Sequence, residues 1–222
     1  MSRIATVIGA SGLIGSHLLQ LLLKDEYWHH VRIIGRRSLN IQHEKLEELV
    51  IDFSNVKSLE QAIAGSEVVF CAIGTTQKKV KGDKDAYRKV DYDIAVNAAK
   101  AAAKYGVFSF LLVSSVGANA DNNNNFYIKL KGVVEETVSK ESIPQLHIFR
   151  PSLLMGNRSE KRTGENFFQA LAPVFSPFLL GKARKYKPIK GEDVARAMLA
   201  ASKLQTRGIF IHEYDSMRKL VG

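Results

Sequence analysis

The sequence predicts an α/β protein with a doubly wound parallel sheet, covered by helices on both faces. Two patterns indicate this fold. Short apolar runs of strand length recur between segments of helical periodicity, and the first run passes through a glycine-rich turn straight into an amphipathic helix. A strand buried on both faces needs apolar residues at nearly every position, and these runs supply them.

Each strand is expected where an apolar run is bounded by turn residues or by a helical pattern. Strands are expected at Ile4–Gly9, Val31–Gly35, Leu49–Phe53, Val68–Ile73, Phe108–Ser114, Leu146–Arg150 and Gly208–His212. Helices are expected at Leu13–Leu23, Leu59–Ala64, Tyr87–Tyr105, Tyr127–Lys140, Glu165–Leu171 and Glu192–Ser202. After Pro151 the pattern loosens, and a stretch rich in proline and lysine runs to Pro188.

The composition narrows the class of protein. With 45% apolar and 24% charged residues, the chain has the balance of an ordinary globular protein. Cys71 lies within an apolar run and is expected to be a buried thiol in a reducing compartment. No secretory signal and no apolar stretch of the roughly 18 to 20 residues that span a bilayer is visible, so a cytoplasmic protein without a membrane span is expected. The histidines form no metal-ligand cluster, and no metal is expected.

The net charge of +10 leaves three classes of partner to weigh: nucleic acid, anionic lipid and a phosphorylated small molecule. Basic residues concentrate in Lys78–Lys84 and Arg158–Lys190, and neither stretch interleaves aromatic residues as a base-stacking surface would. A solvated basic surface, or an entrance that attracts anionic small molecules, is therefore favoured, and nucleic-acid binding is not expected.

The glycine-rich turn has the chemistry of a phosphate cradle. Gly9, Gly12 and Gly15 follow the first strand at once and open the first helix. Such a turn lets the backbone approach a pyrophosphate closely and places it at the positive end of the helix dipole. The cofactor-binding residues expected here are Gly9, Ala10, Ser11, Gly12, Leu13, Ile14 and Gly15. The alternative is a tight strand-to-helix turn with no ligand.

Arg36 and Arg37 stand at the end of the second strand, where an NAD-binding domain would place an acid on the ribose. A guanidinium binds a phosphate in a bidentate fork, so NADP(H) is expected as the cofactor, with general surface basicity as the alternative. At the end of the fourth strand, small residues would let the backbone approach the ribose and phosphates. These residues include Ile73, Gly74, Thr75 and Thr76.

A single Rossmann-type domain spanning 1–222 follows from these patterns. Residues 1–156 are expected to form the dinucleotide-binding core, and residues 157–222 a C-terminal segment that caps the carboxyl edge of the sheet and helps to shape the substrate site. About seventy residues are too few for an independent second domain.

Candidate catalytic residues lie around the fifth strand. Tyr127 and Lys131 are four residues apart, hence on one face of a predicted helix, and Ser114 and Ser115 end the preceding strand. A free tyrosine has a pKa near 10, and a neighbouring ammonium group favours the phenolate and so lowers such a pKa. A serine hydroxyl can donate to a substrate carbonyl oxygen. The alternative is an exposed helix tyrosine beside a solvated lysine.

These residues resemble the catalytic and binding set of the short-chain dehydrogenase/reductase superfamily, in its atypical and extended branches. The stretches that are most similar to the HIV Tat-interactive oxidoreductase group are Gly9–Gly12, Ile34–Arg37, Gly74–Thr76, Ser114–Ser115, Tyr127, Lys131–Glu135 and Phe149–Pro151. Together they extend over nearly the whole chain.

The resemblance implies roles for several residues. Tyr127 would be the acid/base, Lys131 would also hold the nicotinamide ribose, and a serine, for which Ser115 is favoured over Ser114, would bind the carbonyl. Asp52 and Phe53 would lie against the adenine, and the turn formed by Arg150, Pro151 and Ser152 would lie against the nicotinamide carboxamide. Many extended members carry an asparagine where this sequence has Asp91, so their proton relay is not carried over. The late helix start at Gly191–Ala195 fits the same pattern.

Two functions of different class follow. The first is an NADPH-dependent reductase of a small carbonyl substrate, acting as a monomer or homodimer. The second is an NADPH-binding regulatory or interaction protein that controls a protein partner and has little turnover. Residues that would shape a substrate pocket are expected in Gln77–Asp85 and Ser159–Lys190.

Overall fold

The computed structural model describes residues 3–75, 82–155 and 179–222. Its main sheet has seven parallel strands in the order β3-β2-β1-β4-β5-β6-β9. The strands are β1 (Ile4–Ile8), β2 (His30–Gly35), β3 (Leu46–Val50), β4 (Val68–Cys71), β5 (Ser109–Val113), β6 (Gln145–Phe149) and β9 (Gly208–His212). The doubly wound α/β fold is thereby confirmed.

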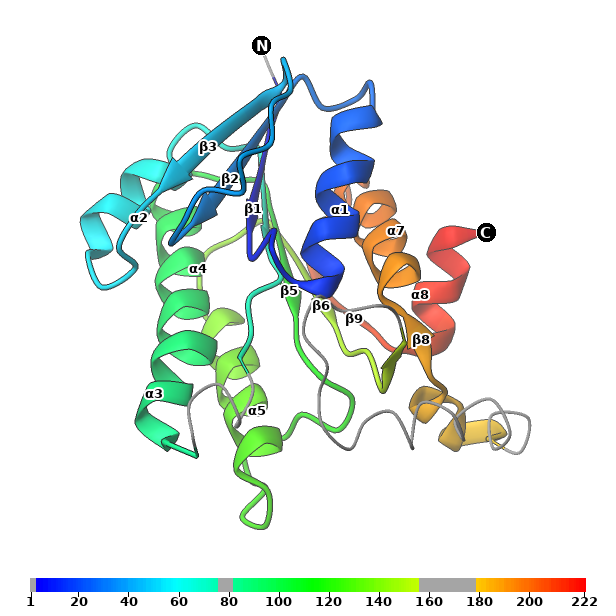
Figure 1. Ribbon diagram of the computed structural model, residues 1–222. Helices are drawn as coiled ribbons and strands as arrows, with labels where there is room; N and C mark the ends of the chain where they lie inside the picture. The colour runs from blue at the N-terminus through cyan, green and yellow to red at the C-terminus, as the bar shows by residue number, and fades with distance from the viewer. Residues whose placement is uncertain (1–2, 76–81, 156–178) are drawn as a thin grey trace.

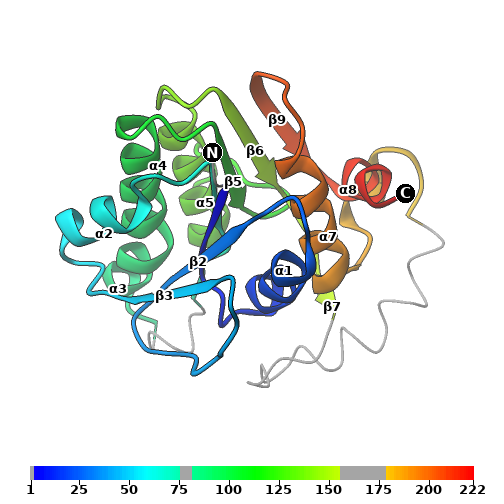
Figure 2. The ribbon, with the colours of Figure 1, turned by 90° about the horizontal axis from the view of Figure 1, so that it is seen from above.

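Helices cover both faces of this sheet (Figures 1 and 2). One face carries α1 (Leu13–Lys24), α7 (Gly191–Ser202) and α8 (Tyr214–Val221); the other carries α2 (Val56–Ile63), α4 (Ile94–Lys104) and α5 (Phe126–Val138). Two hydrophobic cores result. The first packs β-strand residues such as Val7 and Phe149 against α1 and α7, and the second packs residues such as Ile8 and Phe110 against α2, α4 and α5.

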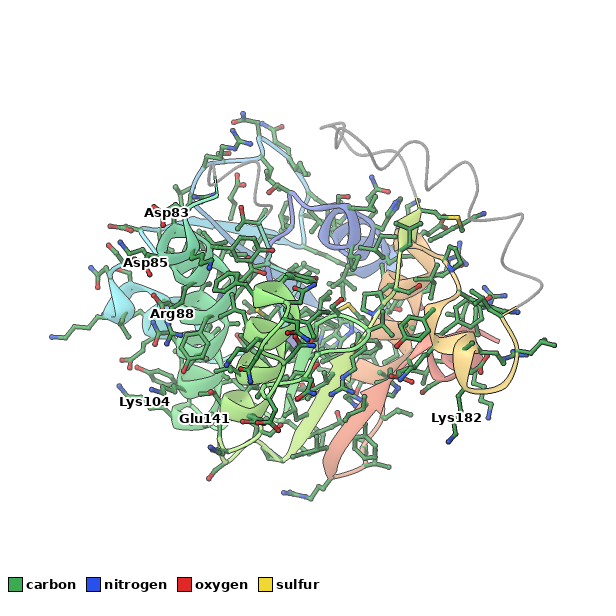
Figure 3. All side chains as sticks on the ribbon, turned by 90° about the horizontal axis from the view of Figure 1, so that it is seen from below. Asp83, Asp85, Arg88, Lys104, Glu141 and Lys182 are labelled. Carbon is green, nitrogen blue, oxygen red and sulfur yellow. The ribbon has the colours of Figure 1, made fainter. Side chains whose placement is uncertain are left out.

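The remaining described elements lie at or near the carboxyl edge, the lower end of the molecule in Figure 1. They are α3 (Lys84–Arg88), a π-helical turn (Lys89–Asp93), β7 (Leu154–Met155), a 3-10 helix (Gly181–Tyr186) and β8 (Ile189–Lys190), which pairs with β7 in a second, two-stranded sheet. Figure 3 views the molecule from this end, with Asp83 and Arg88 on the far side of the molecule from Lys182.

The observed elements depart from the expected ones most clearly in three places. The third strand runs over Leu46–Val50 and not Leu49–Phe53, because at the edge of the sheet it is half exposed and carries Glu47 and Glu48. The helix expected over Tyr87–Tyr105 is divided into α3, the π-helical turn and α4. Helix α8 was not expected, since only one of its residues, Met217, is buried. The helix expected at Glu165–Leu171 lies outside the described residues.

The C-terminal segment contributes to the sheet and to the helical layer on one of its faces. Strand β9 pairs with β6, and α7 lies against α1 so closely that a Cβ atom at Gly191 would be 2.7 Å from Cγ of Leu13. Residues 179–222 therefore complete the sheet and one helical layer, while the boundary at residue 156 stays a prediction.

Candidate active site

The glycine turn after β1 requires glycine on steric grounds. Gly9 has φ of +92°, and a Cβ atom there would be 2.7 Å from the carbonyl oxygen of Ala72. A Cβ at Gly15 would be 2.1 Å from the carbonyl oxygen of Gly9. Gly12, at the N-cap of α1, donates its N–H to that same oxygen at 2.9 Å and provides no side-chain cap. Because α1 directly follows β1, its N-terminal N–H groups lie at the carboxyl edge of the sheet, and the first turn contains no acid that would repel a phosphate there.

Arg36 and Arg37 follow β2 and are exposed. Because β2 pairs with β1, their strand ends next to the glycine turn. Within the part of the chain that is described, neither guanidinium forms an ion pair with a carboxylate. Both side chains are thus available to an anion bound beside β2.

The acid expected at the adenine lies just beyond β3. The carboxylate of Asp52 accepts the backbone N–H of Ser54 at 2.9 Å and its hydroxyl at 2.6 Å, and these bonds hold the pKa of Asp52 below its usual value. Phe53 is half-buried and packs against the core on the α2 and α4 side. Both residues lie on the carboxyl side of the sheet, as expected.

After β4 the chain crosses the site at Gly74 and Thr75. The Thr75 N–H donates to Oδ2 of Asp91 at 2.7 Å, and Tyr87 donates its hydroxyl to the carbonyl oxygen of Thr75 at 3.2 Å. The segment is therefore fixed from beneath by α3 and the π-helical turn. Thr76, also expected to bind the cofactor, lies outside the described residues.

Tyr127 and Lys131 share one face of α5, as the four-residue spacing predicts, with Nζ of Lys131 6.0 Å from the Tyr127 ring centroid. Lys131 is buried, and its Nζ is 2.9 Å from Oδ1 of Asp91, which is also buried. Burial by itself would lower the pKa of Lys131, but the negative charge of Asp91 and the proximity of Tyr127 outweigh it, so this pKa is raised. Lys131 is consequently an ammonium group at neutral pH.

The two candidate serines have different surroundings. Ser114 is buried and donates its hydroxyl to the Glu135 carboxylate, which also binds the Arg150 guanidinium through Nε at 3.0 and 3.2 Å. Ser115 is half-buried, and its hydroxyl makes only a long 3.4 Å contact with the carbonyl oxygen of Val116. The Ser115 hydroxyl is the one left available to a substrate.

The turn after β6 is held by internal contacts. Pairing with Glu135 raises the pKa of Arg150, and the Ser152 hydroxyl donates to the carbonyl oxygen of Lys187. The carbonyl oxygen of Pro151 accepts the N–H of Val116 at 2.9 Å. The side chains of Arg150 and Ser152 thus have protein partners, and a contact of this turn with the cofactor stays a prediction for its backbone.

Sequence reasoning missed the roles of two carboxylates at this edge. Glu135 lies four residues after Lys131, so it shares the inward face of α5, and this spacing could have indicated it. Asp91 was identified only as a departure from a family pattern, and its pairing with Lys131 depends on the π-helical turn, which has no sequence signal that we can identify.

Comparison with known proteins agrees with this geometry. A family described as NAD(P)H-binding matches residues 9–203. The chain belongs to this family. Within it, the chain falls in the HTATIP2 and FMP52 group of the atypical short-chain dehydrogenases/reductases, which confirms the resemblance seen in the sequence.

Two relatives illustrate the extent of the similarity. The protein HTATIP2 of Rattus norvegicus is 36% identical over 163 residues, which are 72% of this chain and 66% of the rat protein. The mitochondrial protein FMP52 of Debaryomyces hansenii is 33% identical over 92% of this chain and 90% of its own length.

Solved structures share the fold at low sequence identity. The Bordetella bronchiseptica enzyme WbmH, solved in complex with NAD+, has a TM-score of 0.70 at 18% identity and matches 96% of this chain and 76% of its own. A UDP-N-acetylglucosamine 4-epimerase from Methanobrevibacter ruminantium has a TM-score of 0.71 at 17% identity, over 96% of this chain and 76% of its own.

The relatives correct one expectation. Six fungal FMP52 proteins, 29 to 33% identical, are named mitochondrial, so the expectation of a cytoplasmic protein is wrong. It depended on the lack of a secretory signal and of a long apolar segment, but mitochondrial targeting sequences are amphipathic and need neither.

In the described part of the chain, no helix is long and apolar enough to cross a membrane. Among the same residues, no group of three or more histidine, cysteine, aspartate or glutamate side chains is placed to hold a metal ion.

Proposed function

We propose that the protein reduces a small carbonyl compound with NADPH. The observation that carries this proposal is the arrangement at the N-terminal end of α5. Tyr127 lies one helical turn from Lys131, a buried ammonium group that pairs with Asp91, and Asp91 in turn binds the Thr75 N–H after β4. NADPH, when bound, supplies a hydride to the carbonyl carbon.

The chain's own residues would handle the proton and the developing charge. The Ser115 hydroxyl donates a hydrogen bond to the carbonyl oxygen and orients it. The Tyr127 hydroxyl delivers its proton to that oxygen as the alkoxide forms, and the proton is later regained from solvent. Lys131, as a fixed positive charge, stabilises the phenolate that remains on Tyr127.

A cavity of about 250 Å³ at the N-terminal ends of α3 and α5 supports a small substrate. It is lined by Gly82, Asp83, Lys84, Tyr87 and Phe126. The ring of Tyr87 lies edge-on to those of both Phe126 and Tyr127, with centroids 5.9 and 6.3 Å apart. Tyr87 therefore lies between this cavity and the Tyr127 ring, and the lining combines two aromatic rings with the charged residues Asp83 and Lys84.

The preference for NADPH over NADH is tested by fluorescence titration of both nucleotides. Replacing Arg36 or Arg37 by alanine removes a charge-assisted contact to the 2′-phosphate, so NADPH affinity should fall about tenfold or more while NADH affinity stays unchanged. Arg207→Ala is the matched control, because this arginine is exposed and precedes β9 at the opposite edge of the sheet. Equal affinities for the two nucleotides in the unmodified protein would refute the preference.

Turnover is tested with Tyr127→Phe, which keeps the ring and removes the proton donor. Carbonyl reduction, followed by NADPH absorbance, should slow by a factor on the order of 10² to 10⁴, with NADPH affinity retained. Tyr105→Phe, at the exposed end of α4, is the control. If the Tyr127 variant binds NADPH and turns over every accepted carbonyl at the unmodified rate, Tyr127 is not the acid/base and the proposed mechanism fails. An unmodified protein that binds NADPH but reduces none of the carbonyl compounds tested would favour the regulatory role instead.

A further inference from the structure

One carboxylate beneath the site connects the two segments that are expected to hold the cofactor's ribose. Asp91 is 2% exposed and uses each of its oxygens once: Oδ1 is 2.9 Å from Nζ of Lys131, and Oδ2 accepts the N–H of Thr75 at 2.7 Å. A Cβ atom at Gly74 would be 3.5 Å from Oδ1, so the carboxylate also lies directly under that residue. Asp91 thus joins α5 to the loop after β4.

The π-helical turn is what brings Asp91 to this position. It interrupts the helix between α3 and α4 at Lys89–Asp93, and such turns are frequently found at functional sites. Of the five residues in the turn, Asp91 is the buried one. A carboxylate is placed here at the cost of desolvation, which its two strong contacts offset.

Each of the two contacts needs its own acceptor oxygen. An ammonium group buried to the extent of Lys131 is unfavourable without a carboxylate beside it. An amide in place of the carboxylate would present one oxygen and one NH₂ group, so either the ammonium or the Thr75 N–H would face a donor. The site therefore depends on the charge of residue 91 and not on its shape alone.

Other ionisable groups near Lys131 do not replace Asp91. From α5, the side chain of Tyr127 is a phenol and not a carboxylate. From β4, Cys71 is a buried thiol, and burial raises its pKa to about 11, so it carries no charge. Glu135, one turn along α5, is occupied by Arg150 and Ser114. Asp91 is the carboxylate that compensates the lysine.

We propose that Asp91 is a positioning residue that holds Lys131 in its ammonium form and fixes the lysine and the Thr75 backbone as one unit for cofactor binding. The cofactor part of this inference rests on the proposed function. The charge part rests on the contacts of the protein alone, and the two parts are tested separately.

The charge part is tested by thermal unfolding without cofactor, from pH 7 to 10. In Asp91→Asn, Lys131 is buried without a countercharge, so its folded-state pKa falls below the unfolded value, and stability rises with pH up to about 10.5. In the unmodified protein the pKa of Lys131 is raised, and its contribution is lost only above that value. The melting-temperature deficit of the variant should therefore shrink as pH rises.

Two further variants keep this measurement decisive. Asp91→Asn combined with Lys131→Met removes both charges, and it should melt higher than the single variant and show no such pH dependence. Glu60→Gln, which breaks an exposed ion pair with Lys104, should lower the melting temperature slightly, by an amount that does not vary between pH 7 and 10. If the melting temperature of Asp91→Asn lies below that of the unmodified protein by the same amount from pH 7 to 10, the charge part is overturned.

The cofactor part is tested by NADPH titration of the unmodified protein and Asp91→Asn at pH 6.5 and 9. As Lys131 loses its proton in the variant, a charge-assisted hydrogen bond to the ribose weakens, so the ratio of the two dissociation constants should grow from about threefold to about tenfold. A ratio that is the same at both pH values would mean a merely structural role and would overturn this part. If the unmodified protein binds no NADPH, the proposed function fails, while the melting curves still decide the charge part.

Discussion

Ser114 and Ser115 are adjacent in the chain, yet the structure gives them different tasks. The backbone of an extended segment directs successive side chains to opposite sides. Ser114 therefore points into the cluster with Glu135 and Arg150, and Ser115 is left half-exposed at the end of β5. Ser114 takes part in the contacts that hold the end of β5 to α5 and to the turn after β6, and the Ser115 hydroxyl is available to a substrate.

Alanine substitutions should separate these tasks. Ser114→Ala deprives a buried carboxylate of a donor, and we expect a loss of about 1.5 to 3 kcal/mol in the free energy of unfolding, measured with urea. Ser115→Ala should change that free energy by less than about 0.5 kcal/mol but slow carbonyl reduction by about 10². The reverse pattern, with turnover lost and stability kept in Ser114→Ala, would assign the carbonyl contact to Ser114.

At the scale of elements, close approaches of backbone decide how the site is assembled. Helix α5 meets the loop after β5 at Gly132, where a Cβ atom would be 2.1 Å from the backbone nitrogen of Ala120. In the same loop, Asn119 donates its N–H to the carbonyl oxygen of Ile128 at 3.2 Å. These contacts fix the chain that carries Ser115 against the helix that carries Tyr127.

Replacement of Gly132 by alanine should push this loop away from α5. Alanine gains about 1 kcal/mol in helix propensity, but the clash is with backbone and costs more, so we expect a net loss of about 2 kcal/mol in the free energy of unfolding and slower turnover. Glu136→Ala, on the exposed face of α5, is the control and should change stability by less than about 0.5 kcal/mol. A Gly132 variant more stable than the parent would contradict the packing described for this loop.

At the scale of the whole molecule, the pairing of β6 with β9 brings two histidines together under α8. Nδ1 of His147 is 2.8 Å from Nε2 of His212, whose Nδ1 is 2.8 Å from the Ser216 hydroxyl. Burial lowers the pKa of both histidines to about 4, with the charge of His212 adding to the effect on His147. Both rings are therefore neutral in the folded protein at neutral pH.

This pair should make the fold sensitive to acid. Between about pH 6.5 and pH 4 the unfolded chain binds protons at these histidines and the folded chain does not. The free energy of unfolding therefore decreases as the pH is lowered, by on the order of 3 kcal/mol for each histidine. In urea unfolding, His147→Phe combined with His212→Phe should flatten the decline over this range. His30→Gln, at an exposed position, should leave it unchanged. An unaltered decline in the double variant would show that carboxylates cause the acid sensitivity.

The sequence by itself determined the features that depend on local chemistry. Apolar runs placed six of the seven main strands to within about two residues. The glycine spacing placed the turn after β1, because the positive φ of Gly9 and the close approach of Gly15 to the Gly9 carbonyl oxygen are local requirements of that turn. The edge strand β3 was misplaced because half-exposed strands need not be apolar. The four-residue spacing likewise placed Tyr127 and Lys131 on one face of α5.

Only the tertiary structure decided which buried polar and charged groups meet. Asp91 with Lys131, Glu135 with Ser114 and Arg150, and His147 with His212 are each brought together by different elements. No local pattern specifies such pairs, because they depend on how strands are ordered in the sheet and on where a helix is interrupted. Burial then makes the two ion pairs important, since a charge removed from water is stable only beside its partner, and a buried neutral polar group likewise needs a hydrogen-bond partner.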